Sequence, residues 1–226
     1  MNRNGRIALA VVLASAFFVE TFASPSAQDR GKFVDPRDER EYAWVRLGGT
    51  VWMAENLNYG TWRRSQGRQG WDNCAEPSSQ ATKLCYDDSA QECLEYGGLY
   101  YFEDAKKSCP PGWRLPNERE WIALSAAAGS GGLQSNKENS WRAHAYGGAA
   151  SNPHGWGGLP GGDFSAAYGA FGNKGHKAAW WVDGDSGDCA DLDCYASGVT
   201  LSPYDALSQS TMFSSCDALS VRCVKE

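Results

Sequence analysis

The chain has 226 residues, of which 21% are charged and 12% are aromatic, and its formal net charge at pH 7 is -6. This acidic balance makes nucleic acid and an anionic membrane surface electrostatically poor partners, so we expect neither. The length suits one domain with long loops, and we predict a single domain after the N-terminal segments.

The first 23 residues have the order of a secretory signal peptide. Two arginines precede an apolar run over residues 7–19, and small residues follow around Ala23. The run is too short for a comfortable membrane span. We therefore predict a signal peptide over residues 1–23, cleaved after Ala23 or alternatively after Ala27. The protein is expected to be secreted or held at the cell surface, with no membrane insertion after cleavage.

Residues 24–41 carry many charges and almost no apolar periodicity, which is typical of a disordered leader. The domain is then expected to span residues 42–226. It opens on "YAWVRLGGTVWMAENLNY", in which two short strand patterns flank Gly48 and Gly49. Paired glycines between strands are typical of a tight turn, so we predict a β-hairpin here.

The next part of the chain is predicted to hold a long surface loop and a short helix. Residues 60–82 are polar and carry Trp62 and Trp71, a composition typical of a loop rather than of regular structure. Residues 99–107 follow a Gly-Gly pair and show a helical pattern. We expect a helix over that range.

The run "CPPGWRLPNEREW", from Cys109 to Trp121, predicts the start of a second helix. Asn117 is a preferred N-cap residue, and Glu120 stands three residues later, as in a capping box. Gly129 is placed to end this helix. The residues that recur at helical spacing are Trp121, Leu124, Ser125 and Ala128. Arg114 is expected to form a salt bridge or a backbone contact beside the cap.

Residues 130–175 are rich in Gly, Ser, Asn and Ala, and we predict a long irregular excursion there. Three later segments are predicted as short strands: "KAAWWV", "YASGVTL" and "ALSVRCV". Strands that follow helices after a long loop indicate an α+β fold.

Eight cysteines all lie beyond the predicted signal, and an even number in an exported chain favours disulfides. No C-x-x-C pair occurs, which argues against a zinc ribbon and against thioredoxin-like redox chemistry. Cys85 with Cys93, and Cys189 with Cys194, are near enough in sequence to close local loops. Eight cysteines nevertheless allow 105 full pairings, so spacing alone leaves the connectivity open.

Several motifs together resemble the Fibrobacter succinogenes major paralogous domain, from about Val45 to Glu226: "VWMAENLNY", "CYDD", "YGGLYYF", "CPPGWRLPNEREW", "LPGG" and "SVRCVKE". "RLPNEREW" is also similar to a run in the formylglycine-generating-enzyme-like branch of C-type-lectin-like domains. The resemblance implies an exported bacterial protein with a C-type-lectin-like fold, in which short antiparallel strands and two helices carry long disulfide-stapled loops. It also implies a disulfide between Cys109 and Cys223, which leaves Cys74 for Cys216.

Catalytic chemistry finds little support in the sequence. "DGDSGD" contains the G-D-S-G of serine proteases, but His144 lacks the context of a catalytic histidine. Asp183, Asp185 and Asp188 could supply oxygens to calcium, yet the segment misses the EF-hand pattern and favours a solvated acidic turn. We predict no catalytic residue, no resident metal and no cofactor.

The aromatic content suggests a binding function. The chain has ten tryptophans and ten tyrosines, and four tryptophans fall in polar or glycine-rich stretches: Trp62, Trp71, Trp141 and Trp156. Stacking of sugar rings on exposed aromatic faces is typical of carbohydrate recognition, whereas the plainer interpretation is that these rings cover a loop-rich core. We predict a non-catalytic module that binds an extracellular ligand, most plausibly polysaccharide, through these four residues. The alternative is a structural or surface-assembly protein that contacts cell-surface proteins, and an enzyme ranks third.

Overall fold

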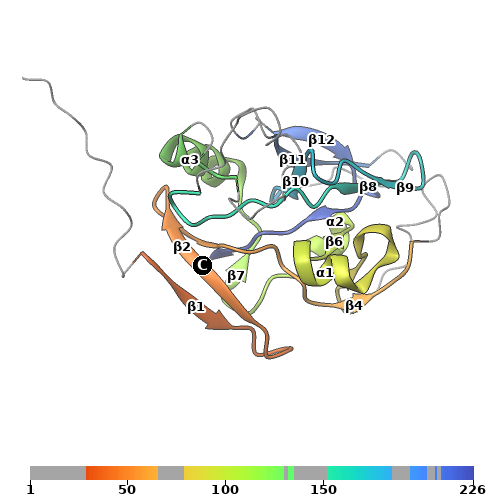
Figure 1. The fold of residues 1–226 in the computed structure, drawn as a ribbon, viewed down its shortest axis with the longest axis horizontal. Helices are drawn as coiled ribbons and strands as arrows, with labels where there is room; N and C mark the ends of the chain where they lie inside the picture. Colours follow the sequence, from red (N-terminus) through yellow and green to blue (C-terminus); the bar gives the residue numbers. More distant parts are fainter. Residues whose placement is uncertain are drawn as a thin grey trace, which may run out of the picture.

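The computed structural model describes residues 29–65, 79–129, 132–134, 152–184, 194–202, 207 and 210–226. These residues form a mixed α+β fold built mostly from short strands (Figure 1). The first sheet has the strand order β1 (Arg30–Val34), β2 (Glu41–Leu47), β3 (Thr50–Met53), β14 (Val224–Lys225) and β7 (Trp113–Arg114). The second has the order β12 (Thr211–Ser214), β11 (Tyr195–Leu201), β10 (Ala178–Trp181), β13 (Leu219–Ser220) and β6 (Leu99–Tyr100).

Two small strand pairs and several helices complete the described part of the fold. The parallel pair is β4 (Thr61–Trp62) with β5 (Thr82–Lys83), and the antiparallel pair is β8 (Asp163–Ser165) with β9 (Ala170–Gly172). The helices are the 3-10 turn η2 (Tyr86–Asp88), α1 (Ala90–Tyr96), α2 (Phe102–Ala105) and α3 (Glu118–Ala128). Among the described residues, no helix is both long enough and apolar enough to cross a membrane.

The predicted hairpin is confirmed. β2 and β3 pair antiparallel, with Leu47 opposite Thr50, and the turn between them is Gly48-Gly49. Both glycines have positive φ, 62° and 83°, as the favoured two-residue hairpin turn requires. A Cβ on Gly48 would also lie 2.7 Å from the backbone of Ala123 in α3. The turn therefore needs glycine both for its conformation and for its close contact with the helix.

The capping box of α3 is also confirmed. Asn117 Oδ1 accepts from the Glu120 amide at 3.1 Å, and Glu120 Oε2 accepts from the Asn117 amide at 2.8 Å. Arg114 donates to both carboxylate oxygens of Glu120, at 2.8 and 2.7 Å, and to the Leu115 carbonyl at 3.0 Å. The predicted salt bridge therefore exists, and it locks the strand β7 to the first turn of α3. Gly129 ends the helix with a φ of 66°.

The C-terminal strand closes the first sheet. Val224 in β14 pairs with Trp52 in β3 on one side and with Arg114 in β7 on the other. Cys109 and Cys223 form a disulfide beside this strand, and Cys85 and Cys93 form a second one. Both pairings agree with the prediction.

The other predicted pairings, Cys189 with Cys194 and Cys74 with Cys216, each involve a cysteine outside the described residues. Cys194 and Cys216 are both disulfide-bonded.

The prediction of a disordered leader is wrong for residues 30–41. β1 occupies Arg30–Val34 and pairs with β2 over its whole length. Phe33 stacks on Trp113, with ring centroids 4.4 Å apart, so the charged stretch does contain an anchoring apolar residue. Residues 1–28, with the predicted signal peptide, lie outside the described part of the chain.

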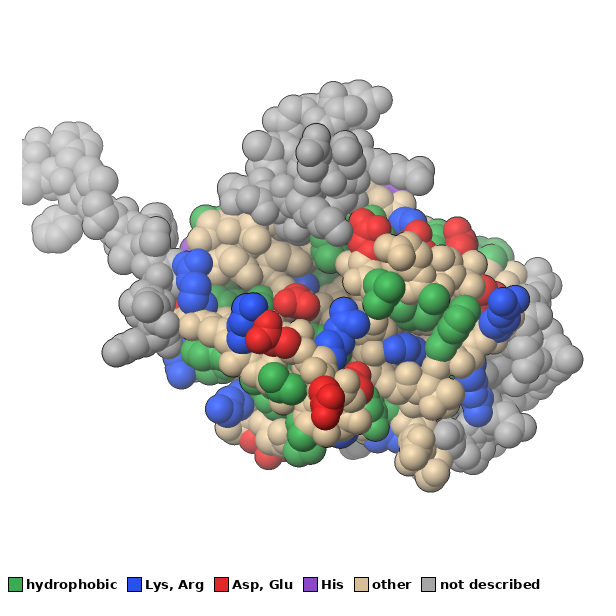
Figure 2. Space-filling model, turned by 60° about the horizontal axis from the view of Figure 1, so that its bottom comes forward, with side chains coloured by type: hydrophobic (Ala, Val, Ile, Leu, Met, Phe, Trp, Pro, Cys, Tyr) green, Lys and Arg blue, Asp and Glu red, His purple; other side chains and the backbone are tan. Residues whose placement is uncertain are grey.

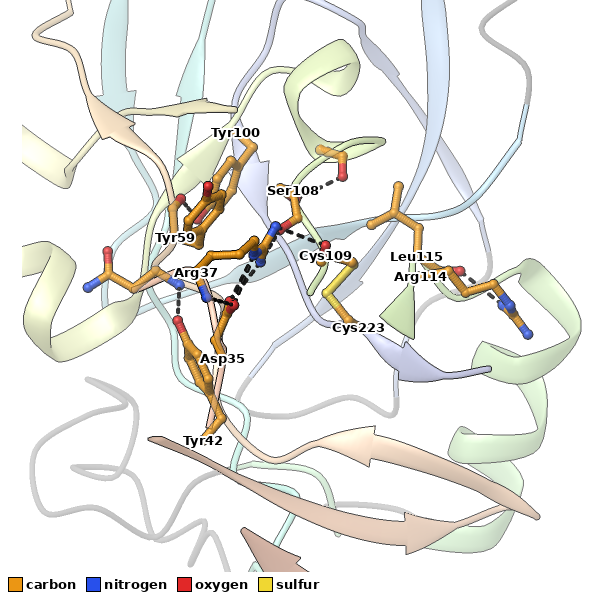
Figure 3. The surroundings of a disulfide bond; sticks show 12 residues. Asp35, Arg37, Tyr42, Tyr59, Tyr100, Ser108, Cys109, Arg114, Leu115 and Cys223 are labelled. Atoms are coloured by element: carbon orange, nitrogen blue, oxygen red, sulfur yellow. Dashed lines mark hydrogen bonds and ion pairs between the residues drawn. A yellow bond between two sulfur atoms is a disulfide. The ribbon is translucent and has the colours of Figure 1, made fainter. Parts of the chain in front are cut away.

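An ion pair fastens the turn that follows β1 to the Cys109 disulfide (Figure 3). Arg37 Nη2 lies 2.7 Å from Oδ2 of Asp35, whose side chain is completely buried. The same guanidinium donates to the carbonyls of Ser108 and Cys109, at 2.8 and 3.0 Å. Its carbon lies 3.6 Å from the ring centroid of Tyr59. These charges are therefore paired and packed instead of being solvated.

Two further predictions need correction. Residues 99–107 do not form one helix, because Leu99 and Tyr100 pair with β13 and only Phe102–Ala105 are helical. The excursion over residues 130–175 is not wholly irregular, because the described part contains the β8–β9 hairpin. Phe164 anchors this hairpin in the interior through contacts with Phe171 and Tyr101.

The core consists of two large apolar clusters between the sheets and helices. The first is centred on four buried tryptophans: Trp52, Trp121, Trp156 and Trp180. The second gathers aromatic and aliphatic side chains that include Tyr42, Tyr100, Phe102 and Trp181. Among the four tryptophans in polar or glycine-rich stretches, the plainer interpretation therefore holds for Trp156.

Candidate binding site

A cleft of about 410 Å³ lies against the β8–β9 hairpin. We call it the hairpin cleft, and its principal lining residues are Asp163, Phe164, Tyr168, Phe171, Asn173, Lys177, Phe213 and Asp217. In Figure 1 the hairpin lies at the opposite end of the molecule from β1 and β2. No lining residue of the cleft belongs to the Arg37 ion pair or to its disulfide.

Asp163 is the centre of the polar wall. Asn173, just after β9, donates its amide to both carboxylate oxygens of Asp163, at 3.0 and 2.9 Å. Lys177 Nζ lies 3.2 Å from Asp163 Oδ2. Asn173 has a φ of 65°, which asparagine tolerates better than most residues, and this conformation ends the hairpin beside Asp163. The cleft therefore presents a fixed carboxylate, amide and ammonium.

Asp217 forms a second acidic group of the cleft. Its Oδ1 accepts from the Ala166 amide at 2.8 Å and its Oδ2 from the Ser214 amide at 3.1 Å. Burial and the nearby charge of Asp163 raise the pKa of Asp217, and these hydrogen bonds only partly oppose that rise. The carboxylate thus joins the end of β8 to the turn after β12.

Aromatic side chains form the apolar wall. Tyr168, at the tip of the hairpin, is 75% exposed. Phe171 is partly buried and contacts Phe164 and Tyr86, with both centroid distances at 5.2 Å. Lys177 Nζ lies 5.8 Å from the ring centroid of Phe213. Phe164 and Phe171 thus pack against each other, and the exposed Tyr168 lines the same cleft.

This combination suits a hydroxyl-rich ligand. Carboxylate, amide and ammonium groups can hydrogen-bond to hydroxyls in fixed directions, and an exposed ring can stack on the apolar face of a sugar. In the part of the chain that the structure describes, no group of three or more His, Cys, Asp or Glu residues is arranged to hold a metal ion. Asp163 is instead neutralised by Lys177.

The four predicted ligand-binding tryptophans have different outcomes in the structure. Trp156 is completely buried in the first core cluster, so its assignment to a ligand surface is wrong. It is buried because Arg222 and three other tryptophans surround its ring. Trp62 is 38% exposed on β4 and remains a candidate, whereas Trp71 and Trp141 lie outside the described residues.

Only the first two residues of the acidic turn lie within the described part of the chain. Asp183 is exposed, and its amide donates to the Pro116 carbonyl at 2.8 Å. Asp185 and Asp188, the other two predicted calcium ligands, lie outside the described residues. A calcium site at this turn therefore stays a hypothesis.

The hairpin cleft is not predicted from the sequence. Most of its residues lie in "DFSAAYGAFGNKGHK", which the glycine and alanine content assigned to irregular structure, and Phe213 and Asp217 join them from a distant part of the chain. The sequence does carry a signal, because Phe164 and Phe171 stand on either side of Gly169. In the structure Gly169 has a φ of 61°, as a turn glycine can adopt. Two short apolar runs separated by a glycine-containing turn indicate a hairpin.

Comparison with known proteins identifies one family. The model of the Fibrobacter succinogenes major domain matches residues 45–225, which is most of the chain. None of the curated proteins compared with the chain matches it, and none of the solved structures does.

Proposed function

The chain belongs to the Fibrobacter succinogenes major domain family, and we propose that it is an exported, non-catalytic module that binds polysaccharide at the hairpin cleft. The observation that carries this proposal is the position of Tyr168. Tyr168 is exposed and lines the same cleft as the fixed polar groups of Asp163, Asn173 and Lys177. An accessible ring next to directional hydrogen-bonding groups is the arrangement that sugar recognition requires.

The state of the two carboxylates supports binding rather than catalysis. Asp163 is held by an ammonium and an amide, and Asp217 by two backbone amides. Each carboxylate still has unused lone pairs that can accept from hydroxyls. Both groups are therefore suited to orient a ligand, and no hydrogen bond among the described residues joins either carboxylate to Ser165, the serine that lines the cleft.

Two features support export and a C-type-lectin-like arrangement. The disulfides Cys85–Cys93 and Cys109–Cys223 are of a kind that persists in oxidising compartments. β14 pairs with both β3 and β7, so the end of the domain returns to the first hairpin and closes a loop around the core. Short strands that carry long connections are what the lectin-like resemblance implies.

Recognition must depend on local contacts. On the face drawn in Figure 2, acidic, basic and hydrophobic side chains are interspersed over the described residues. The net charge of -6 also gives no general attraction toward an acidic polymer. Ligand selectivity therefore depends on shape, ring stacking and hydrogen bonding at a small site.

Affinity electrophoresis in gels that contain hydroxyethylcellulose, arabinoxylan or galactomannan tests this proposal. We expect retardation by at least one polymer, and a loss of about tenfold in affinity for Tyr168→Ala, corresponding to about 1.4 kcal/mol. Tyr195→Ala is the matched control, because Tyr195 is also exposed but does not line the cleft. Equal loss in both variants, or no retardation by any polymer, would contradict the proposal. Cross-linking on intact cells would then test the alternative of surface assembly.

A further inference from the structure

A second, smaller pocket lies between the turn after β1 and the β4–β5 pair. It has a volume of about 210 Å³, and Asp38, Asn58, Tyr59, Thr61 and Lys83 are among its lining residues. We call it the Lys83 pocket. None of these residues lines the hairpin cleft, so an argument about this pocket is independent of the proposed polysaccharide site.

Lys83 is a partly buried cation without a carboxylate partner. Its ammonium donates to the backbone carbonyl of Asn58 and, at 2.6 Å, to Asn58 Oδ1. Both acceptors are neutral, and no ion pair joins Lys83 to a carboxylate of the described residues. An ammonium has three donors, so one N–H remains for a ligand.

The charges around the pocket leave a surplus of positive charge. Burial, and to a lesser degree the charge of Arg40, lower the pKa of Lys83, Asp38 opposes this effect, and the resulting pKa is about 8. Arg37 is already paired with Asp35. Because the charge of Lys83 is poorly compensated, an anion that enters the pocket stabilises it.

The residue paired with Lys83 in the neighbouring strand is a tryptophan. β4 and β5 run parallel, and Trp62 is the register partner of Lys83. Directly paired residues of adjacent strands point to the same face of a sheet. Trp62 is partly exposed, and the Arg64 guanidinium lies 5.9 Å from its ring centroid. The pair therefore combines a stacking surface with a donor to an anion.

We propose that the Lys83 pocket and Trp62 form a subsite for a carboxylated sugar, such as a uronate residue of an acidic polysaccharide. The free N–H of Lys83 donates to the sugar carboxylate, and the Trp62 ring stacks on the apolar face of the pyranose. A simple carboxylate would use only the first contact, and a neutral sugar only the second. The juxtaposition of both contacts selects a sugar that carries its own carboxylate.

Titration calorimetry with hexagalacturonate and with its methyl ester tests this subsite on the full domain. We expect the acid to bind at least tenfold more tightly than the neutral ester. Lys83→Met should abolish this difference, and Trp62→Ala should weaken both ligands. Lys106→Met is the matched control, because Lys106 does not line the pocket. Tyr168→Ala should leave hexagalacturonate binding unchanged, which separates this result from failure at the hairpin cleft.

Competitive acetylation of the unmutated protein covers the case in which a variant fails to fold. Peptide mass spectrometry should find Lys83 protected severalfold by hexagalacturonate, and neither the methyl ester nor polyglutamate should protect it. Equal protection by polyglutamate would show a plain carboxylate site and overturn the assignment to a sugar. Binding of acid and ester with equal affinity, or no protection of Lys83, would overturn the subsite altogether.

Discussion

The guanidinium of Arg222 lies against the indole ring of Trp156, with its carbon 3.9 Å from the ring centroid, and both side chains are completely buried. Arg222 donates to the carbonyls of Trp156 and Gly157, the latter at 2.9 Å, and its Nε donates to Asn56 Oδ1 at 3.0 Å. Asn56 also accepts from Trp180 Nε1 at 2.9 Å. One buried cation thus joins segments that are far apart in the sequence, with neutral oxygens as its partners.

Replacing Arg222 should unfold or severely destabilise the domain. Arg222→Lys keeps the charge but cannot reach three acceptors from one rigid plane, and Arg222→Met removes the donor to the buried Trp156 carbonyl and to the partly buried Gly157 carbonyl. We expect each variant to lose about 3 kcal/mol or more of the free energy of unfolding, measured by urea titration. Arg119→Met, at an exposed position of α3, should change it by less than about 0.5 kcal/mol. A tolerated Arg222→Met would show that the network is dispensable.

The ion pair of the β1 turn predicts a second stability effect. Arg37→Met leaves the buried Asp35 carboxylate unpaired and removes two hydrogen bonds to carbonyls beside the disulfide. We expect a loss of about 3 kcal/mol, together with faster amide exchange in β1. Asp35→Asn in the Arg37→Met background should recover part of this loss, because it removes the unpaired charge. Equal stability of the single and double variants would argue against a buried charge as the cause.

Local signals in the sequence predicted local structure well. The Gly48-Gly49 turn and the Asn117–Glu120 cap depend on residues within a few positions of each other, and both were predicted correctly. The Cys85–Cys93 pair also spans a short loop. Where backbone geometry and neighbouring residues determine the local structure, the residue types and their spacing are sufficient to predict it.

Contacts between distant residues account for the errors. Arg37 gives the pattern of a solvated charge, yet its carbonyl partners at Ser108 and Cys109 lie 71 and 72 positions away. Trp156 stands among glycines, which suggested a surface loop, and its backbone carbonyl binds Arg222, 66 positions later. Nothing local marks either residue as buried. The hairpin cleft was missed for the same reason, since Asp217 joins it from beyond β12.

The two described disulfides should differ in their contribution to stability. The Cys109–Cys223 bridge spans 114 residues and the Cys85–Cys93 bridge only 8. The chain-entropy model gives about 5 kcal/mol for the long loop and about 2.5 kcal/mol for the short one. Urea titration of Cys109→Ala/Cys223→Ala and Cys85→Ala/Cys93→Ala should reproduce this order. The reverse order would mean that the unfolded chain already holds Cys109 near Cys223.

The cap of α3 predicts a pH dependence of stability. Burial raises the pKa of Glu120, but hydrogen bonds from Arg114 and the Asn117 amide lower it by more, so the pKa lies below its ordinary value. A carboxyl whose pKa is depressed by folding stabilises the fold fully above the unfolded-state pKa. The stabilisation is lost as the pH falls through the folded-state pKa, hence in the acid range below about pH 4.5.

Glu120→Gln tests this pH dependence. The variant should be less stable than the unmutated protein by about 1 kcal/mol at pH 7, since the bidentate contact with Arg114 and part of the capping box are lost. This gap should stay constant down to about pH 5 and narrow as the pH falls to 3, because protonation weakens the same contacts in the unmutated protein. Glu118→Gln is the control, because Glu118 is exposed in the same helical turn. Urea titrations at each pH measure the gap, and a gap that is unchanged at pH 3 would exclude Glu120 as its source.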